Sequence, residues 1–209
     1  MDGTLFETAP ELSDSINLML KDLKMAELEK DEIKNFIGKG AENLINQSIK
    51  FSSKKDPSLF FTKAEKLFDQ HYSLHSRKSH MFDGVEKTIA DLKSKGFLLG
   101  CVTNKPTHYT TALMKESRLI ESMDIIVSGD TTEKKKPDPL PIQYALNQLT
   151  IGPKEAIMVG DSCVDIEAGF AAGTYIVTVP YGYQYGESII SDKVDYAMSH
   201  FKELTQIIN

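Results

Sequence analysis

The sequence has little that would place it outside the cell or in a membrane. Its 209 residues include two cysteines, Cys101 and Cys163, too few for a disulfide framework, which favours a reducing cytoplasm. No apolar run approaches the roughly 20 residues that a membrane helix needs, and no signal segment opens the chain. Positive charge is also scarce: the sequence has 24 Lys and Arg against 30 Asp and Glu, which gives a net charge of −6. We therefore expect neither a membrane protein nor a general nucleic-acid-binding protein.

The first third of the chain has the periodicity of helices. Its apolar residues recur at helical spacing in four stretches, and no strand pattern is found between Pro10 and His80. The expected helices cover 10–24, 31–37, 41–51 and 58–76. This part is therefore expected to be a small helical module, inserted between two parts of something else.

Beyond residue 80, strands alternate with helices. The expected strands are 97–102, 125–128, 156–159 and 174–179. The expected helices are 85–95, 108–117, 139–149, 164–172 and 201–208. Such alternation is typical of an α/β fold with a doubly wound parallel sheet and helices on both faces. Asp2-Gly3-Thr4-Leu5 has the pattern of a turn that leaves one more strand, of which the sequence contains only Met1.

Residues that can carry chemistry stand where the expected strands end. They are Asp2, Thr103 with Asn104, Lys136, and Asp161 with Asp165. In a parallel sheet these ends converge on one crevice. Clustered carboxylates repel one another unless a cation holds them, and hard oxygen ligands favour Mg²⁺. A hydroxyl, backbone N–H groups and an ammonium complement the oxygens of a phosphoryl group, so the set predicts phosphoryl transfer.

In their order along the chain, these motifs resemble those of the haloacid dehalogenase-like hydrolase superfamily, and in detail its phosphatases. The resemblance is carried by Asp2-Gly3-Thr4-Leu5, Gly38-Lys39-Gly40, Val102-Thr103-Asn104-Lys105-Pro106, Lys136-Pro137-Asp138-Pro139, Val159-Gly160-Asp161-Ser162 and Tyr181-Gly182-Tyr183. It implies a Rossmann-like hydrolase core made of residues 1–9 and 80–209. It also implies that residues 10–79 are a helical cap domain.

The resemblance assigns Asp2 to the second aspartate of the family's Asp-x-Asp-Gly-Thr motif. That residue protonates the leaving group and then activates water, so we expect its pKa to be raised toward neutrality. Its carbonyl oxygen would bind Mg²⁺. The family's nucleophile, the first aspartate, would lie two positions earlier, upstream of Met1, together with the first core strand. Aspartyl-phosphate chemistry needs that carboxylate, so we expect either further residues before Met1 in the native protein or an unstable or inactive chain.

The remaining motif residues receive roles in the same way. Thr103, with the backbone of Asn104, would hold the phosphoryl oxygens, and Lys136 would stabilise the nucleophile and the developing charge. Asp161 would be a Mg²⁺ ligand. Asp165 would be a second acidic residue that supports either the metal or Lys136.

Some of these residues also have an ordinary structural interpretation. Lys136 could be one member of a solvated run of three lysines, although the Pro-Asp-Pro that follows favours a functional role. Gly38-Lys39-Gly40 could simply end a helix. The equivalent loop in the family faces the active site, which implies that Lys39 contacts the substrate's second anionic end. Tyr181-Gly182-Tyr183 could line the edge of the site or only shape a loop.

The sequence therefore predicts a cytoplasmic, Mg²⁺-dependent phosphatase that acts on a small phosphorylated metabolite through an aspartyl-phosphate intermediate. The resemblance favours 2-phosphoglycolate as the substrate, and we expect a monomer or a homodimer. A pyrophosphatase or a phosphomutase of the same superfamily would use the same core site. A non-catalytic fragment that keeps phosphate binding is the alternative outside the enzymes.

Overall fold

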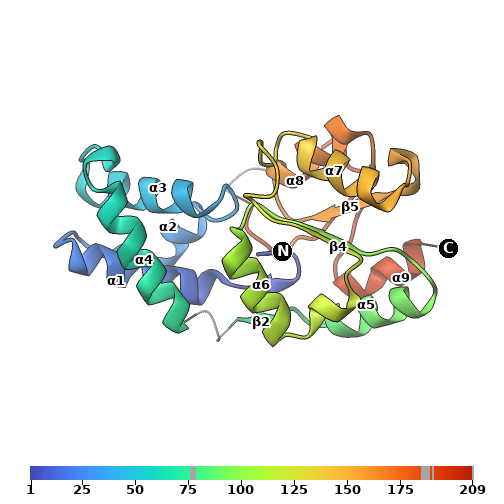
Figure 1. Ribbon diagram of the computed structural model, residues 1–209, viewed down its shortest axis with the longest axis horizontal. Coiled ribbons are helices and arrows are strands. Elements are labelled where there is room, and N and C mark those ends of the chain that lie inside the picture. The colour runs from blue at the N-terminus through green and yellow to red at the C-terminus, as the bar shows by residue number, and fades with distance from the viewer. Residues whose placement is uncertain (76–78, 185–188, 190, 209) are drawn as a thin grey trace.

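The computed structural model describes residues 1–75, 79–184, 189 and 191–208 (Figure 1). Four helices lie together at one end of the molecule, and strands flanked by helices form the other end. Within the described part of the chain, no helix is both long enough and apolar enough to cross a bilayer. The helical end and the end with strands both agree with the sequence patterns, but some helices and strands begin or end at other residues than expected.

The helical part contains the four helices expected from the periodicity. They are α1 (Ala9–Asp22), α2 (Lys30–Lys34), α3 (Ala41–Ser53) and α4 (Phe61–His75). Ser76, the last residue of the expected fourth helix, lies outside the described residues. Helix α1 shows why they pack, because Ile16, Met19 and Leu20 fall on one face and are fully buried, each stabilising the fold by about 2 kcal/mol. These helices share an apolar cluster, to which Tyr109 and Tyr183 add their rings, and residues 10–79 stay our proposal for the cap.

Parallel strands with helices on both faces make up the other part. The strands are β3 (Gly100–Val102), β4 (Ile125–Val127), β5 (Ile157–Gly160), β6 (Tyr175–Thr178) and β7 (Tyr196–Ala197). The helices are α5 (Val85–Ser94), α6 (Thr107–Glu116), α7 (Leu140–Leu149), α8 (Cys163–Ala172) and α9 (Leu204–Ile207). Strand β3 pairs with β4, and β6 pairs with both β5 and β7, all in parallel. Helices α7 and α8 lie on one side of these strands, and α5 and α9 lie on the other (Figure 1).

The structure differs from the sequence-based expectation at several strands. The expected strand 97–102 begins only at Gly100, because the N–H of Leu99 is bound by the carboxylate of Asp124 instead of a neighbouring strand. Strand β7 was not expected. Nor was the antiparallel pair β1 (Phe6–Glu7) and β2 (His80–Met81), which joins the two chain segments leading into and out of the helical part. Strands of two residues are too short for periodicity to reveal.

An apolar cavity separates the two groups of parallel strands. It has a volume of about 260 Å³ and is lined by β3 and β5, whose facing edges are not paired with each other. Met1 and Leu5 also line it. The carboxyl ends of β3 and β5 therefore stand on either side of the first turn of the chain.

Candidate active site

The predicted site residues come together at one cleft. It has a volume of about 50 Å³ and lies between the strand ends and the helical part, where Gly38, Gly40 and Tyr72 contribute to its wall. From the strand side it is lined by Asp2, Thr103, Asn104, Lys136, Asp161 and Asp165. Lys39 is exposed and does not line this cleft, although the glycines on either side of it do.

A tight turn brings Asp2 to the cleft. The N–H groups of Thr4, Leu5 and Phe6 all point at the carbonyl oxygen of Met1, and Gly3 has a φ of +77°, which favours glycine. The Asp2 carboxylate lies 3.1 Å from the ammonium of Lys105. Burial opposes ionisation of Asp2, but the Lys105 charge holds the pKa of Asp2 below its usual range. The expectation of a raised pKa is therefore wrong for this structure, because the sequence did not reveal the lysine partner.

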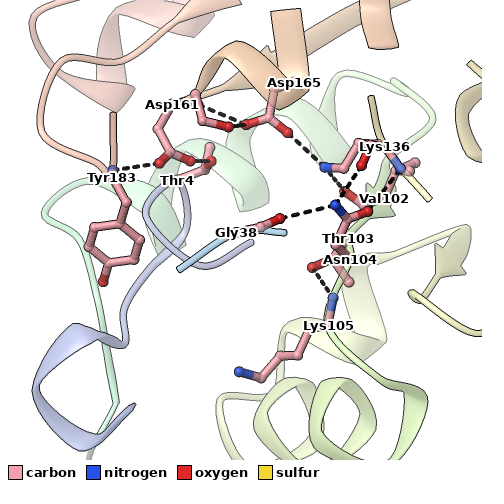
Figure 2. A network of polar contacts seen from close by, with 11 residues as sticks. Thr4, Gly38, Val102, Thr103, Asn104, Lys105, Lys136, Asp161, Asp165 and Tyr183 are labelled. Carbon is pink, nitrogen blue, oxygen red and sulfur yellow. Dashed lines mark hydrogen bonds and ion pairs between the residues drawn. The ribbon is translucent and has the colours of Figure 1, made fainter. Parts of the chain in front are cut away.

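Asp161 is held in a fixed orientation at the end of β5. Its Oδ1 accepts a hydrogen bond from the hydroxyl of Thr4 at 2.5 Å, and its Oδ2 accepts one from the N–H of Tyr183 at 2.7 Å (Figure 2). Gly3 and Gly182 pack so closely on this carboxyl that a Cβ at either position would collide with it. Burial and the nearby charge of Asp165 raise the pKa of Asp161 to about 7.

Lys136 and Asp165 form a buried ion pair. The Lys136 ammonium donates to Oδ1 of Asp165 at 2.7 Å and to the carbonyl oxygen of Val102 at 2.6 Å (Figure 2). The other carboxylate oxygen of Asp165 accepts from the Ser162 hydroxyl and from a main-chain N–H. Burial opposes the charge of Asp165, but Lys136 lowers the pKa of this carboxyl below its usual value. The Lys136 side chain is 5% exposed against 66% for Lys134, so it is not part of a solvated run.

Asn104 ties the loops around the cleft to one another. Its side-chain amide donates to the carbonyl oxygens of Gly38 and Lys136, at 3.0 and 2.8 Å, and accepts from the Lys136 N–H at 2.9 Å. The loop at Gly38 thereby contacts the end of β3 directly, as Figure 2 shows. Thr103 is buried beside Asn104, and its hydroxyl oxygen accepts from the N–H of Lys105.

Tyr183 has a structural role that the sequence left open. Its buried hydroxyl accepts from the N–H groups of Thr8 and Ala9, at 2.7 and 2.8 Å, and donates to the Glu7 carboxylate at 2.7 Å. These residues form the segment that enters helix α1. Tyr183 therefore links the segment that enters helix α1 to Asp161. The motif Tyr181-Gly182-Tyr183 was the feature of the sequence that pointed to this tyrosine.

Lys105 and Glu11 are further buried ionisable residues that the sequence analysis did not single out. Lys105 follows Asn104 and pairs with Asp2, so its place in Thr103-Asn104-Lys105 was a signal for it. Glu11 lies in the first turn of α1 and is 3% exposed. Burial raises the pKa of Glu11 to about 7. No sequence pattern distinguishes Glu11 from an exposed glutamate at the start of a helix.

The donor set fits a Mg²⁺ ion that keeps part of its water shell. Among the described residues, no three His, Cys, Asp or Glu side chains lie close enough to form a metal centre by themselves. Mg²⁺ usually takes one or two protein carboxylates and completes its shell with water and substrate phosphate. Asp161 is buried beside a second carboxylate, and a divalent cation would relieve that repulsion. The charge of Asp165 is already balanced by the Lys136 ammonium, whereas Asp161 accepts hydrogen bonds from two uncharged donors, the Thr4 hydroxyl and the Tyr183 N–H, so Asp161 is the better placed side-chain ligand.

The comparisons with known proteins identify the class. Residues 1–179 match the family described as haloacid dehalogenase-like hydrolase, and the chain belongs to this family. Its Rossmann-like α/β core with an inserted helical cap is therefore confirmed.

Its relatives define the type of enzyme. A phosphoglycolate phosphatase of Nitrosospira multiformis is 37% identical over 211 residues, which cover all of this chain and 92% of the relative. One of Nitrosococcus oceani is 33% identical over all of this chain and 94% of the relative. The crystal structure of a predicted phosphoglycolate phosphatase from Haemophilus somnus 129pt superposes with a TM-score of 0.95 at 28% identity, covering 100% of this chain and 95% of that one. The chain is a phosphoric monoester hydrolase of the phosphoglycolate phosphatase type.

Proposed function

We propose that the protein hydrolyses 2-phosphoglycolate in the cytoplasm, with Mg²⁺ as cofactor. One observation carries this proposal: four segments far apart in the sequence bring Asp2, Thr103, Lys136 and Asp161 to one cleft. Together they offer an acid or base, a hydroxyl, an ammonium and a metal-binding carboxylate, the parts that phosphoryl transfer needs. The names of the relatives support the choice of substrate.

Each residue at the cleft has a defined part in this chemistry. The Thr103 hydroxyl and the Asn104 backbone hold the phosphoryl oxygens, and the Lys136 ammonium, oriented by Asp165, stabilises their negative charge. Asp161 and the Asp2 carbonyl oxygen would hold the Mg²⁺, which neutralises charge on the phosphoryl group when bound. Asp2 takes up a proton when the negative charge of the bound phosphoryl group raises the pKa of its carboxyl, gives this proton to the leaving oxygen and later takes one from the attacking water.

The nucleophile in this proposal is an aspartate two positions before Asp2, upstream of Met1. The cavity between β3 and β5 supports this, because it is apolar, bordered by two strand edges, and lined at one end by Met1. A strand that entered this cavity and continued into Met1 would complete the sheet. It would also bring an aspartate to the carboxyl end of the strands, where the other site residues lie.

The test measures release of phosphate from 2-phosphoglycolate by two versions of the protein, with and without Mg²⁺. One version begins at Met1, and the other includes the residues encoded in frame upstream. We expect Mg²⁺-dependent hydrolysis by the longer version, lost when the aspartate two positions before Asp2 is replaced by Asn. If both versions are folded, as far-UV circular dichroism would establish, and neither releases phosphate, the proposed function is wrong.

A further inference from the structure

Lys105 is a buried lysine whose ammonium joins separate parts of the chain. Its side chain is 5% exposed. The ammonium lies 3.1 Å from Oδ1 of Asp2 and donates to the hydroxyl oxygen of Tyr72 at 2.7 Å. A charge taken out of water needs such partners, because leaving it unpaired is strongly unfavourable. Partners from the first turn of the chain and from helix α4 therefore fix its position.

Aromatic packing holds Tyr72 in turn. Its ring stacks on Phe68, with centroids 5.4 Å apart and 10° between the planes, and meets Tyr109 edge-on at 4.8 Å. The Lys105 ammonium lies 4.8 Å from the centre of the Tyr72 ring, within range of a cation–π interaction. Since Tyr72 belongs to α4 and Lys105 follows β3, these contacts join the helical part to the strand ends beside the cleft.

The surroundings of Lys105 differ from those of Lys136. The Lys136 ammonium contacts Asp165 and a carbonyl oxygen at the end of β3. The Lys105 side chain points away from that network, as Figure 2 shows. The two buried lysines therefore serve different carboxylates, and the family motifs give a role only to Lys136.

We propose that Lys105 is a positioning residue for Asp2, and that Tyr72 keeps Lys105 in place while α4 is packed against the strand ends. The inference rests on the proposed function, in which Asp2 protonates the leaving group. Because one oxygen of the carboxyl is held by a fixed ammonium, Asp2 keeps a single orientation toward the cleft, which favours reaction. The packing of the cap and the orientation of the acid are thereby coupled.

The leaving group reveals whether Asp2 is positioned correctly. In the first half of the reaction, the bond between phosphorus and the leaving oxygen breaks as the phosphoryl group moves to the nucleophilic aspartate. The leaving oxygen keeps the electron pair and takes the proton of Asp2, which becomes a carboxylate. An alkoxide needs this proton, whereas 4-nitrophenolate is stable without it. Removal of the Lys105 charge would by itself let the pKa of Asp2 rise and favour its protonated form, so slower cleavage of alkyl phosphates than of an aryl phosphate would report the lost orientation of Asp2.

The experiment uses whichever version of the enzyme hydrolyses 2-phosphoglycolate in the test above. It compares kcat/KM on 2-phosphoglycolate, 2-hydroxyethyl phosphate and 4-nitrophenyl phosphate, since this constant reports the steps up to departure of the leaving group. For Lys105→Met we expect a fall of about 100-fold on both alkyl phosphates and less than about 5-fold on the aryl phosphate. Tyr72→Phe, which keeps the ring, should show the same pattern at about 10-fold. Lys105→Arg, which keeps the charge, should recover part of the lost activity.

Lys87→Met is the matched control. Lys87 lies on α5 with a side chain that is 80% exposed, and its variant should hydrolyse all three compounds as the parent does. An equal fall on all three compounds in Lys105→Met would mean that Lys105 only stabilises the fold. A fall confined to 2-phosphoglycolate would mean that Lys105 binds the substrate carboxylate. Either of these results overturns the inference about Lys105 but leaves the proposed function standing, whereas the failure of both versions to hydrolyse 2-phosphoglycolate in the earlier test overturns the proposed function. If Lys105→Met does not fold, Tyr72→Phe decides.

Discussion

The main-chain N–H of Tyr183 donates to Oδ2 of Asp161 at 2.7 Å, while the hydroxyl of the same tyrosine holds the segment that enters helix α1. A single buried side chain thus links the proposed metal ligand to the connection with the helical part. Movement of that connection would shift Asp161, because the two are joined through the buried, rigid ring of Tyr183.

Removal of the Tyr183 hydroxyl should destabilise the protein. Tyr183→Phe leaves the buried N–H groups of Thr8 and Ala9 without their acceptor, and an unsatisfied buried donor costs about 1–3 kcal/mol. We expect the free energy of unfolding, measured with urea, to fall by about 2 kcal/mol. Tyr144→Phe on α7 is the control, since Tyr144 is 38% exposed, and should change this free energy little. Equal stability of the two variants would contradict the role given to the hydroxyl.

The ion pair between Lys136 and Asp165 should show strong coupling. Either Lys136→Met or Asp165→Asn leaves the other residue of the pair buried and charged, with no opposite charge to balance it. Breaking a buried pair in this way costs about 3–5 kcal/mol. The double variant should lose less stability than the sum of the two single losses, by about 1–3 kcal/mol. A double-mutant cycle, with the free energy of unfolding measured in urea, gives this coupling free energy. Additive losses would show that Lys136 and Asp165 are not coupled. Lys136→Met should also abolish phosphate release, because the charge that faces the phosphoryl group is gone.

The pH dependence of stability should report Glu11. Burial raises the pKa of Glu11 to about 7 in the folded protein, from an ordinary value of 4.5. The folded state therefore holds this proton more tightly, so its stabilising contribution is complete below pH 4.5 and is lost as the pH rises through about 7. Glu11→Gln, which is neutral throughout, should be more stable than the parent at pH 8 by about 2 kcal/mol and nearly equal at pH 4. Urea unfolding at both values checks this, and a difference that does not change with pH would contradict it.

The convergence of the site could be predicted because Thr103 and Asp161 directly follow apolar strands, Asp2 lies in the pattern of a turn that leaves one, and Lys136 lies in the loop after β4. That geometry depends only on parallel pairing, so Asp2 and Asp161 could be assigned to one crevice without coordinates. The contact between Lys105 and Tyr72 could not be predicted from the sequence, because it depends on how helix α4 of the inserted part packs on the strand ends. The lowered pKa of Asp2 was not predicted because it comes from Lys105, a core residue to whose place in the motif no role was assigned.

Mg²⁺ should stabilise the protein in a pH-dependent way that requires Asp161. With its pKa raised to about 7 by burial and by Asp165, Asp161 holds a proton at low pH that a cation must displace. Addition of Mg²⁺ should therefore raise Tm clearly at pH 8, where the carboxylate is ionised, and much less at pH 5.5. Asp161→Asn should remove the rise at pH 8, whereas Asp195→Asn, on an exposed segment before β7, should keep it. Chelation with EDTA should reverse the effect in the parent. A rise in Tm that is equal in parent and Asp161→Asn would place the cation elsewhere, and one that is equal at both pH values would show that no proton is displaced when it binds.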